Sequence, residues 1–99
     1  MIKKFRHKGL KRFFDDPRYS DKRGINNEIA DRLIVILDAL NTIENAEEMD
    51  IVGLYFHGLK GQRKGEYSVR VSGNWRITWR ITWRMDSNNV VDLNLEDYH

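Results

Sequence analysis

Histidines, lysines and arginines are the residues of this chain that could carry out acid/base and phosphate chemistry. The 99 residues include three histidines, and 17 lysines and arginines stand against 15 acidic residues, for a formal net charge of +2. Histidine titrates near pH 6.5, so one imidazole can accept a proton while another donates one close to neutral pH. The chain has no cysteine, and His7, His57 and His99 match no zinc-binding spacing, so the sequence predicts no disulfide framework, no metal site and no cofactor.

The charges are segregated along the chain. Residues 1–12 hold six basic residues and no acid, and residues 60–84 hold seven basic residues against Glu66 alone. Residues 13–59 hold four basic residues against ten acids, and residues 85–99 hold four acids and no base. This pattern indicates a cationic face and an anionic face, and faces lined with arginine commonly bind phosphates. Ordinary solvated surface is the alternative interpretation.

Length and composition limit the class of protein. With 99 residues, 40% of them hydrophobic and 32% charged, the chain fits one small packed domain over residues 1–99. No apolar run approaches the roughly 20 residues that span a bilayer, and the first residues lack the apolar stretch of a secretion signal. The sequence therefore predicts a cytoplasmic protein that does not contact membranes.

The first half of the chain predicts a short strand and two helices. A strand over Ile2–Phe5 precedes a brief helix with apolar residues at i, i+3 and i+4, and Pro17 ends that helix. A longer helix begins near Asn26 or Asn27, either of which is a suitable N-cap. Its apolar face consists of Ile29, Leu33, Ile36, Leu37 and Leu40.

The second half of the chain predicts an antiparallel sheet, because the apolar period changes from 3.6 to 2. Residues 67–72 alternate and end at a Gly73-Asn74 turn, and residues 75–84 alternate Trp or Ile with Arg or Thr. A turn at Asp86–Asn89 leads to a last strand with Val91, Leu93 and Leu95 on the core side. The predicted fold class is α+β: two N-terminal helices pack on one face of an antiparallel meander, and the other face is free for a ligand.

The string WRITWRITWR contains a tandem RITW. Four is an even number, so such an insertion leaves every later side chain on its original face. We expect a longer hairpin in which Val91–Leu95 pairs with the first copy and the second copy extends past the sheet edge, exposing Ile81 and Trp83. The alternative is a shift of the C-terminal residues out of place.

Four motifs, in order and spacing, resemble those of the HigB toxins of bacterial toxin–antitoxin pairs, within the wider RelE-like group. They are the opening MIKKFRHKGLKRFF, the central FHGLKG, then YSVRVSGNWRIT and the terminal EDYH. The resemblance implies a small RelE-like fold, similar to microbial ribonucleases. It also implies an endonuclease that cuts mRNA in the ribosomal A site and is neutralised by a HigA-like helix-turn-helix antitoxin. DNA would be contacted only through that antitoxin, and the duplicated RITW departs from the family pattern.

The resemblance also implies a set of site residues, all of them present. These are His57, Lys60, Arg70, Arg76, Asp97, Tyr98 and His99. Cleavage of RNA without a metal needs a base for the 2′-hydroxyl, an acid for the leaving 5′-oxygen and cations for the phosphorane. The two histidines would serve as base and acid, in an order that stays open. Asp97 would orient His99, Tyr98 would stack on a base or donate to phosphate, and the three cations would bind the phosphate.

Other readings of these residues remain open. A histidine in a loop is more often a surface residue than a catalyst, and the terminal His99 could be frayed or could begin a purification tag. Arg80 and Arg84 fit a solvated sheet face. The tryptophan ladder, which consists of Trp75, Trp79 and Trp83, fits core packing better than base stacking. His7 and the N-terminal lysines fit contacts with ribosomal RNA. An inactive RNA- or antitoxin-binding module, with its site displaced by the repeat, is the main rival, and a DNA-binding repressor fits poorly without a basic recognition helix.

Overall fold

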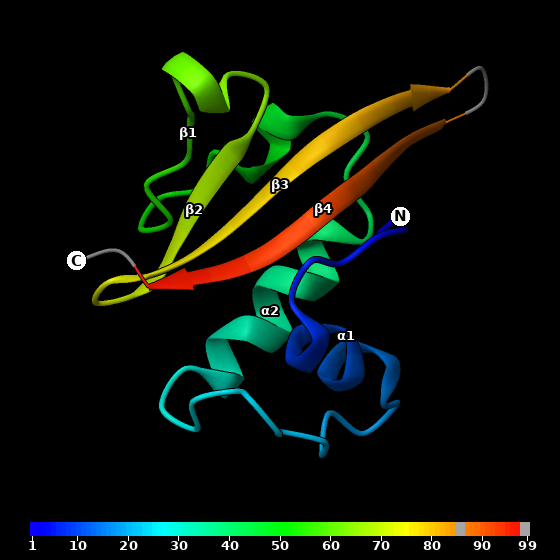
Figure 1. The fold of residues 1–99 in the computed structure, drawn as a ribbon, viewed down its shortest axis with the longest axis vertical. Helices are drawn as coiled ribbons and strands as arrows, with labels where there is room; N and C mark the ends of the chain where they lie inside the picture. Colours follow the sequence, from blue (N-terminus) through cyan, green and yellow to red (C-terminus); the bar gives the residue numbers. More distant parts are fainter. Residues whose placement is uncertain (85–86, 98–99) are drawn as a thin grey trace.

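The chain forms two helices on one side of a four-stranded antiparallel sheet (Figure 1). The computed structural model describes residues 1–84 and 87–97. Its elements are α1 (Lys8–Asp15), α2 (Ala30–Leu40), the 3₁₀ turns η1 (Ala46–Met49) and η2 (Gly61–Arg63), and the strands β1 (His57–Gly58), β2 (Tyr67–Ser72), β3 (Trp75–Arg84) and β4 (Ser87–Asp97). Strand order is β1-β2-β3-β4, so the predicted α+β meander is confirmed.

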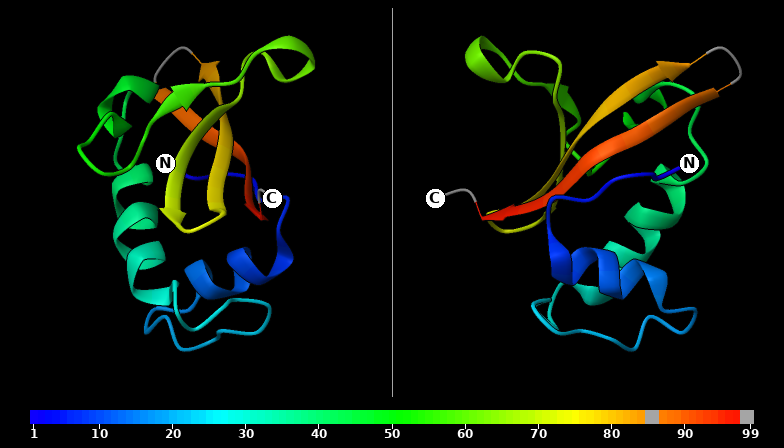
Figure 2. Two further views of the ribbon diagram at one scale, coloured as in Figure 1. Left: turned by 90° about the vertical axis from the view of Figure 1, so that its left-hand side faces the viewer. Right: turned by 45° about the vertical axis from the view of Figure 1, so that its right-hand side comes forward.

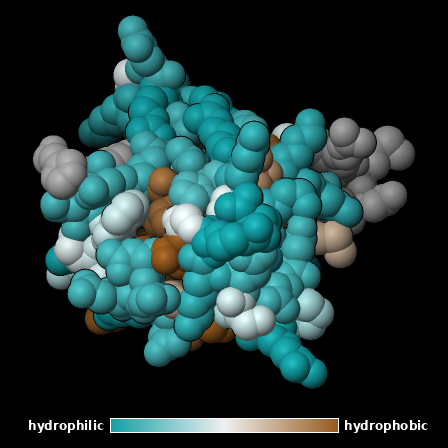
Figure 3. Space-filling view, turned by 60° about the horizontal axis from the view of Figure 1, so that its bottom comes forward, coloured by the Kyte–Doolittle hydropathy of each residue, from teal (hydrophilic) through white to brown (hydrophobic). Residues whose placement is uncertain are grey.

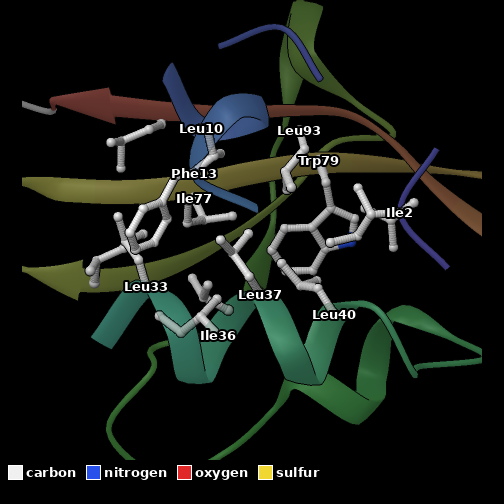
Figure 4. Packing of buried hydrophobic residues seen from close by; sticks show 14 of the residues in the cluster. Ile2, Leu10, Phe13, Leu33, Ile36, Leu37, Leu40, Ile77, Trp79 and Leu93 are labelled. Carbon is white, nitrogen blue, oxygen red and sulfur yellow. The ribbon is translucent and has the colours of Figure 1, made fainter. Parts of the chain in front are cut away.

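The core lies between the helices and one face of the sheet (Figure 4). Leu33, Leu37 and Leu40 of α2 and Leu10 and Phe13 of α1 are fully buried, as the predicted helical periodicity requires. Side chains from the sheet meet them, and the largest of these is the fully buried Trp79; the other labelled sheet residues are Ile77 and Leu93. Core packing of this part of the tryptophan ladder is confirmed.

Two boundaries in the helical half differ from the predicted ones. Asn26 does not cap α2: its side-chain oxygen accepts a hydrogen bond from the Glu28 amide, and α2 begins only at Ala30. The predicted strand Ile2–Phe5 exists only as two isolated parallel bridges to β4, at Ile2 and Phe5. The N-terminal segment therefore runs along the outer edge of β4, next to the sheet (Figure 2).

The tandem repeat is absorbed as a longer β3–β4 hairpin. Ile77 pairs with Leu95 and Thr78 with Asn94, so the predicted pairing with the first RITW copy is confirmed for the end of Val91–Leu95, whereas Val91 lies opposite Arg80 of the second copy. The second copy pairs with the start of β4, beyond the last residue of β3 that pairs with β2, and the hairpin projects there (Figure 1). Ile81 is half-buried against the core instead of exposed. The side chain of Trp83 lies outside the described part of the chain.

A β-bulge in β4 changes which residues face the core. Thr78 pairs with Asn94 but Arg80 pairs with Val91, so β4 has one extra residue there, and Asp92 lies in the left-handed region at φ 53°. The alternation shifts by one residue, so Val90 joins the core and Val91 lies opposite Arg80. The expectation for Leu93 and Leu95 is confirmed; Val91 is buried too, but it lies outside the core cluster, on the side of Arg80. Asn88 and Asn89 are strand residues, where the sequence predicts a turn.

Seen from the helix side, the surface is mostly hydrophilic, with apolar side chains only in small patches (Figure 3). The exposed large apolar side chains in the described ranges are Met1, Val35, Ile51, Val52 and Tyr55. Within residues 1–84 and 87–97, the helices are too short and too polar to cross a lipid bilayer.

Candidate active site

The sheet face turned away from the helices, here called the open face, carries the candidate cations. Arg70 of β2 lies directly opposite Arg76 of β3, and Arg76 lies opposite Glu96 of β4. Directly opposed residues share a face of the sheet, and their neighbours Val69, Ile77 and Leu95 are all in the core. The three charged residues therefore form one row across the open face.

His57 belongs to the next row of the open face. It is in the short strand β1, opposite Ser68, which in turn lies opposite Thr78. The sequence places His57 in a loop, so its pairing with the sheet is a correction. Two residues separate the rows along each strand, a rise of about 7 Å. The exposed imidazole of His57 thus lies on the same face as the arginine row, one row away.

The turn before β1 supports both His57 and Arg70. The Tyr55 carbonyl lies 3.1 Å from Nδ1 of His57. A carbonyl oxygen can only accept a hydrogen bond, so Nδ1 carries the proton of the neutral imidazole. Nε2 is then the nitrogen that can take up or donate a proton in catalysis. The Arg70 guanidinium carbon lies 5.4 Å from the centre of the Tyr55 ring, a cation–π contact, and the Arg70 amide donates to the Leu54 carbonyl at 2.6 Å. Residues 54–57 therefore fix the imidazole and the guanidinium relative to each other.

The remaining candidate residues are placed less completely. Lys60 is exposed and directly precedes η2. Asp97 pairs with Trp75, so strand alternation places it on the side of Leu95, opposite to the arginine row. Tyr98 and His99 lie outside the described residues, so their contacts with the other candidates stay predictions.

The centre of the open face is covered, contrary to expectation. Ser68 and Thr78 are 0% exposed although they point away from the helices. The cover is Arg63 of η2, whose guanidinium lies between Glu66 and Glu96. Around Arg70 and Arg76 the face is half-open.

Arg63 makes a double fork between two carboxylates. Its Nη1 and Nη2 donate to the two oxygens of Glu96 at 2.9 and 2.6 Å, and its Nε and Nη2 donate to those of Glu66 at 3.0 and 3.1 Å. Thr78 also donates its hydroxyl proton to Glu96. Planar guanidinium groups suit such paired contacts, which are among the stronger hydrogen bonds in proteins.

These contacts keep both carboxylates ionised. Hydrogen bonding from Arg63 lowers the pKa of Glu66 despite burial, and Arg80 and Arg6, with contacts of 3.7 and 3.9 Å, add to the effect. Burial alone would raise the pKa of Glu96, but the hydrogen bonds from Arg63 and Thr78 lower it overall. Arg80 is therefore a half-buried ion-pair partner of Glu66 and Asp92 instead of a solvated sheet residue.

Sequence reasoning missed Arg63, Glu66, Glu96 and Tyr55. One signal was present, because Glu66 is the sole acid between residues 60 and 84. A single acid in a basic block indicates a buried ion-pair centre, and Glu66 is 4% exposed.

The N-terminal basic block divides into a structural histidine and a lysine-lined groove. His7 is the N-cap of α1, and its Nδ1 accepts a hydrogen bond from the Leu10 amide at 2.9 Å. This gives His7 a structural role that is separate from the predicted contact with ribosomal RNA. Lys3 and Lys4 border a groove of about 550 Å³ with Thr82, Asn89, Val91 and Asp92. This groove lies at the projecting end of the hairpin, away from Arg70 and Arg76.

The histidine cap gives a pH prediction. Burial and the nearby Arg12 charge lower the pKa of His7. The neutral imidazole is also the form that caps the helix, because a protonated Nδ1 could not accept the Leu10 amide. The folded state then binds fewer protons than the unfolded chain, so the cap's contribution to stability is present above pH 6.5 and declines as the pH falls below it. Denaturant unfolding between pH 7.5 and 5.5 should show this decline, and H7N, which keeps a cap, should flatten it. An equally steep decline in H7N would contradict the assignment.

Comparison with known proteins identifies the family and the fold. The family model described as RelE-like toxin of type II toxin-antitoxin system HigB matches residues 3–99. The chain is 37% identical over 99 residues to Endoribonuclease HigB of Proteus vulgaris, and the match covers all of both chains. Among solved structures, the YoeB/ParE toxin from Agrobacterium tumefaciens shares the fold, with a TM-score of 0.62 over both whole chains at 13% identity. The chain therefore belongs to the HigB-like family of RelE-like toxins of type II toxin–antitoxin systems.

Proposed function

We propose that this chain, acting as one RelE-like domain over residues 1–99, is an endoribonuclease toxin. Its full-length similarity to Endoribonuclease HigB of Proteus vulgaris supports RNA cleavage as the activity. Membership of a type II toxin–antitoxin family supplies the second element of the function, an antitoxin partner. We further propose that the substrate is mRNA in the ribosomal A site and that the antitoxin is a HigA-like helix-turn-helix protein.

The observation that carries the proposal is the grouping of His57 with the arginine row on the open face. RNA cleavage needs a proton-transfer group beside cations that stabilise the charge growing on phosphorus. Tyr55 holds the proton on Nδ1 of His57, and the same residue supports Arg70. One turn of the chain thus sets a general acid or base next to a phosphate-binding cation.

The proposed reaction needs no cofactor. The 2′-oxygen attacks phosphorus as a base removes its proton, and the bond from phosphorus to the 5′-oxygen breaks as an acid protonates the leaving oxygen. The products are a 2′,3′-cyclic phosphate and a 5′-hydroxyl. His57 and His99 take the base and acid roles between them, and Arg70, Arg76 and Lys60 bind the phosphate. Asp97 orients His99, and Tyr98 stacks on a base or donates to phosphate.

The inactive binding module is the less favoured alternative. It depends on the duplicated RITW displacing the C-terminal motif. Glu96 and Asp97 lie opposite Arg76 and Trp75, next to the β2–β3 turn, because the additional residues are taken up at the far end of the hairpin (Figure 1). The displacement on which that alternative depends is absent from residues 87–97.

Dependence on the ribosome is the test of this function. With a net charge of +2 and only three candidate phosphate-binding cations, Arg70, Arg76 and Lys60, the chain is poorly equipped to capture free RNA, so the ribosome must supply positioning. We expect rapid mRNA cleavage on programmed ribosomes, also in excess chelator that leaves ribosomes intact, and hardly any cleavage of naked RNA. The fragments should end in 2′,3′-cyclic phosphate. Digestion of naked RNA at the same rate would exclude ribosome dependence, and 5′-phosphate ends with chelator sensitivity would exclude the mechanism.

A further inference from the structure

Exposed apolar side chains gather on one part of the surface, beside α2. Of the five large ones in the part of the chain that the structure describes, four come from α2 or from residues 51–55. Val35 lies in the middle of α2 and is 68% exposed, whereas the other exposed positions of that helix carry charged residues. Ile51, Val52 and Tyr55 belong to the segment between η1 and β1, and Val52 is fully exposed. Apolar side chains grouped in this way mark a contact surface.

A groove of about 380 Å³, here called the α2 groove, lies between α2 and this segment, which passes beside the helix (Figure 2). Ile36 is buried and Leu54 is half-buried against the core, so the floor of the groove is continuous with the core. A groove of this size can receive apolar side chains of a partner. The residues that line it are Asp31, Arg32, Val35, Ile36 and Leu54.

Hydrogen bonds fix the wall of the α2 groove that faces the helix. The Leu54 amide donates to the Ile51 carbonyl at 3.0 Å, so Ile51 and Val52 lie in the same tight turn as Leu54. The Leu54 carbonyl accepts a hydrogen bond from the Arg70 amide at 2.6 Å, which attaches the turn to β2. A preformed wall loses little conformational freedom when a partner binds, and this favours affinity.

The charges around the α2 groove are mostly acidic. Residues 26–56 contain seven acidic residues and one basic residue. Asp31 and Asp38 lie one turn of α2 before and after Val35, and Asp50 directly precedes the turn; all three acids are exposed. This border repels RNA phosphates, and two copies of the chain that met here face to face would bring like charges together. The partner that fits carries apolar side chains flanked by lysine or arginine.

We propose that the α2 groove binds the antitoxin through an amphipathic helix with an apolar face and basic borders. The inference rests on the proposed function, which includes the antitoxin partner of a type II toxin. Such helices dock into apolar grooves through side chains three or four residues apart. The residues that line the groove do not belong to the proposed catalytic set, so antitoxin binding can be weakened here without loss of cleavage.

Substitutions of Val35 and Val52 test the apolar part of the groove. V35Q removes an apolar side chain from an exposed position, so it should fold normally, and V35L, which keeps an apolar side chain there, is the matched control. Affinity for the purified antitoxin of the same pair should fall about ten- to a hundredfold in V35Q and stay within about threefold in V35L. V52Q, in the turn on the other side, should weaken binding by about threefold or more.

Cleavage separates the antitoxin contact from the catalytic site. Without antitoxin, V35Q, V35L and V52Q should all cleave mRNA on programmed ribosomes at the unmodified rate. V35Q should need about ten to a hundred times more antitoxin for the same inhibition, in proportion to its loss of affinity.

Neutralisation of the border tests the charge of the partner. D31N/D50N removes two of the exposed acids and should slow association with the antitoxin several-fold at low salt. The difference should disappear at about 0.5 M salt, where exposed charges are screened. Faster association of D31N/D50N would show an acidic partner surface and would contradict the inference.

The possible results distinguish this inference from the proposed function. Normal antitoxin binding by V35Q and V52Q would overturn the groove as the binding site and leave the proposed function intact, whereas an unmodified chain that does not bind the antitoxin would refute the proposed partner itself. Slower cleavage by V35Q without antitoxin would make the groove a ribosome contact. A dimer of the toxin alone that V35Q dissociates would make it a contact between copies. Either of these last two results would also overturn the inference.

Discussion

Replacement of His57 by alanine is expected to lower the rate of mRNA cleavage on ribosomes by about 10²- to 10⁴-fold, the usual loss when a general acid or base is removed. The imidazole is exposed on the open face, its Nδ1 is bound to the Tyr55 carbonyl, and Nε2 remains for proton transfer. Folding should be unaffected, because the side chain contributes little to the core. Single-turnover cleavage with a fixed mRNA and excess toxin measures the effect directly.

The chain offers a matched control for this experiment. H7N also removes one histidine, but from the cap of α1, where asparagine can replace the accepting nitrogen. Cleavage by H7N should equal that of the unmodified protein at pH 7.5. If H57A retained more than a tenth of the activity while its melting temperature was unchanged, His57 would not be the acid or base, and the assignment would fall to other groups.

Replacement of Trp79 by alanine is expected to have the largest effect on stability. Trp79 is 0% exposed and packs against Phe56 and Tyr67, with ring centres 6.2 and 6.0 Å away. Truncation of a buried tryptophan costs about 3–5 kcal/mol, out of the 5–15 kcal/mol that holds a typical domain together. For a chain of this length the melting temperature should fall by about 12 °C or more. Thermal and urea unfolding measure it.

W79F is the informative comparison. Among the described residues, the indole nitrogen of Trp79 has no hydrogen-bond partner, so phenylalanine removes a buried donor as well as some volume. The loss for W79F should therefore be well under half of that for W79A. Since Phe56 directly precedes His57, W79A should also lower cleavage at temperatures where it remains folded, and W79F should not. Equal melting temperatures for the two variants would show that the aromatic cluster is not the centre of stability.

The parts of the fold predicted from sequence are those with a regular period. Leu33, Leu37 and Leu40 recur at helical spacing, and Ile77 and Trp79 alternate with polar residues, so burial of these faces follows from geometry alone. The even length of the RITW repeat likewise predicts that Ile77 and Trp79 stay on the core face of β3. In each case the local sequence pattern and the tertiary fold place the same side chains on the core face.

The features missed have no local period. The bulge at Asp92 depends on one residue in the left-handed region. It brings Val90 instead of Val91 into the core cluster, and the alternating apolar pattern of Val91, Leu93 and Leu95 in the sequence gives no sign of it. The pairing of His57 with β2 needs only two residues, too few for a periodic signal. Arg63 meets Glu96 across 33 residues, and only the folded sheet brings them together.

The pairing of the N-terminal segment with β4 has a consequence for the timing of synthesis. The amides of Lys3 and Arg6 donate to Val90 and Leu93, so the first residues to be made bond to some of the last. At roughly 5–20 residues per second, the 87 positions from Lys3 to Val90 take on the order of 4–17 s to synthesise. Throughout this time the N-terminal segment has no strand to bond to. The strand that ends in Glu96 and Asp97 is therefore secured along both edges only when residues synthesised far apart in time have come together, so the folded site forms late in synthesis.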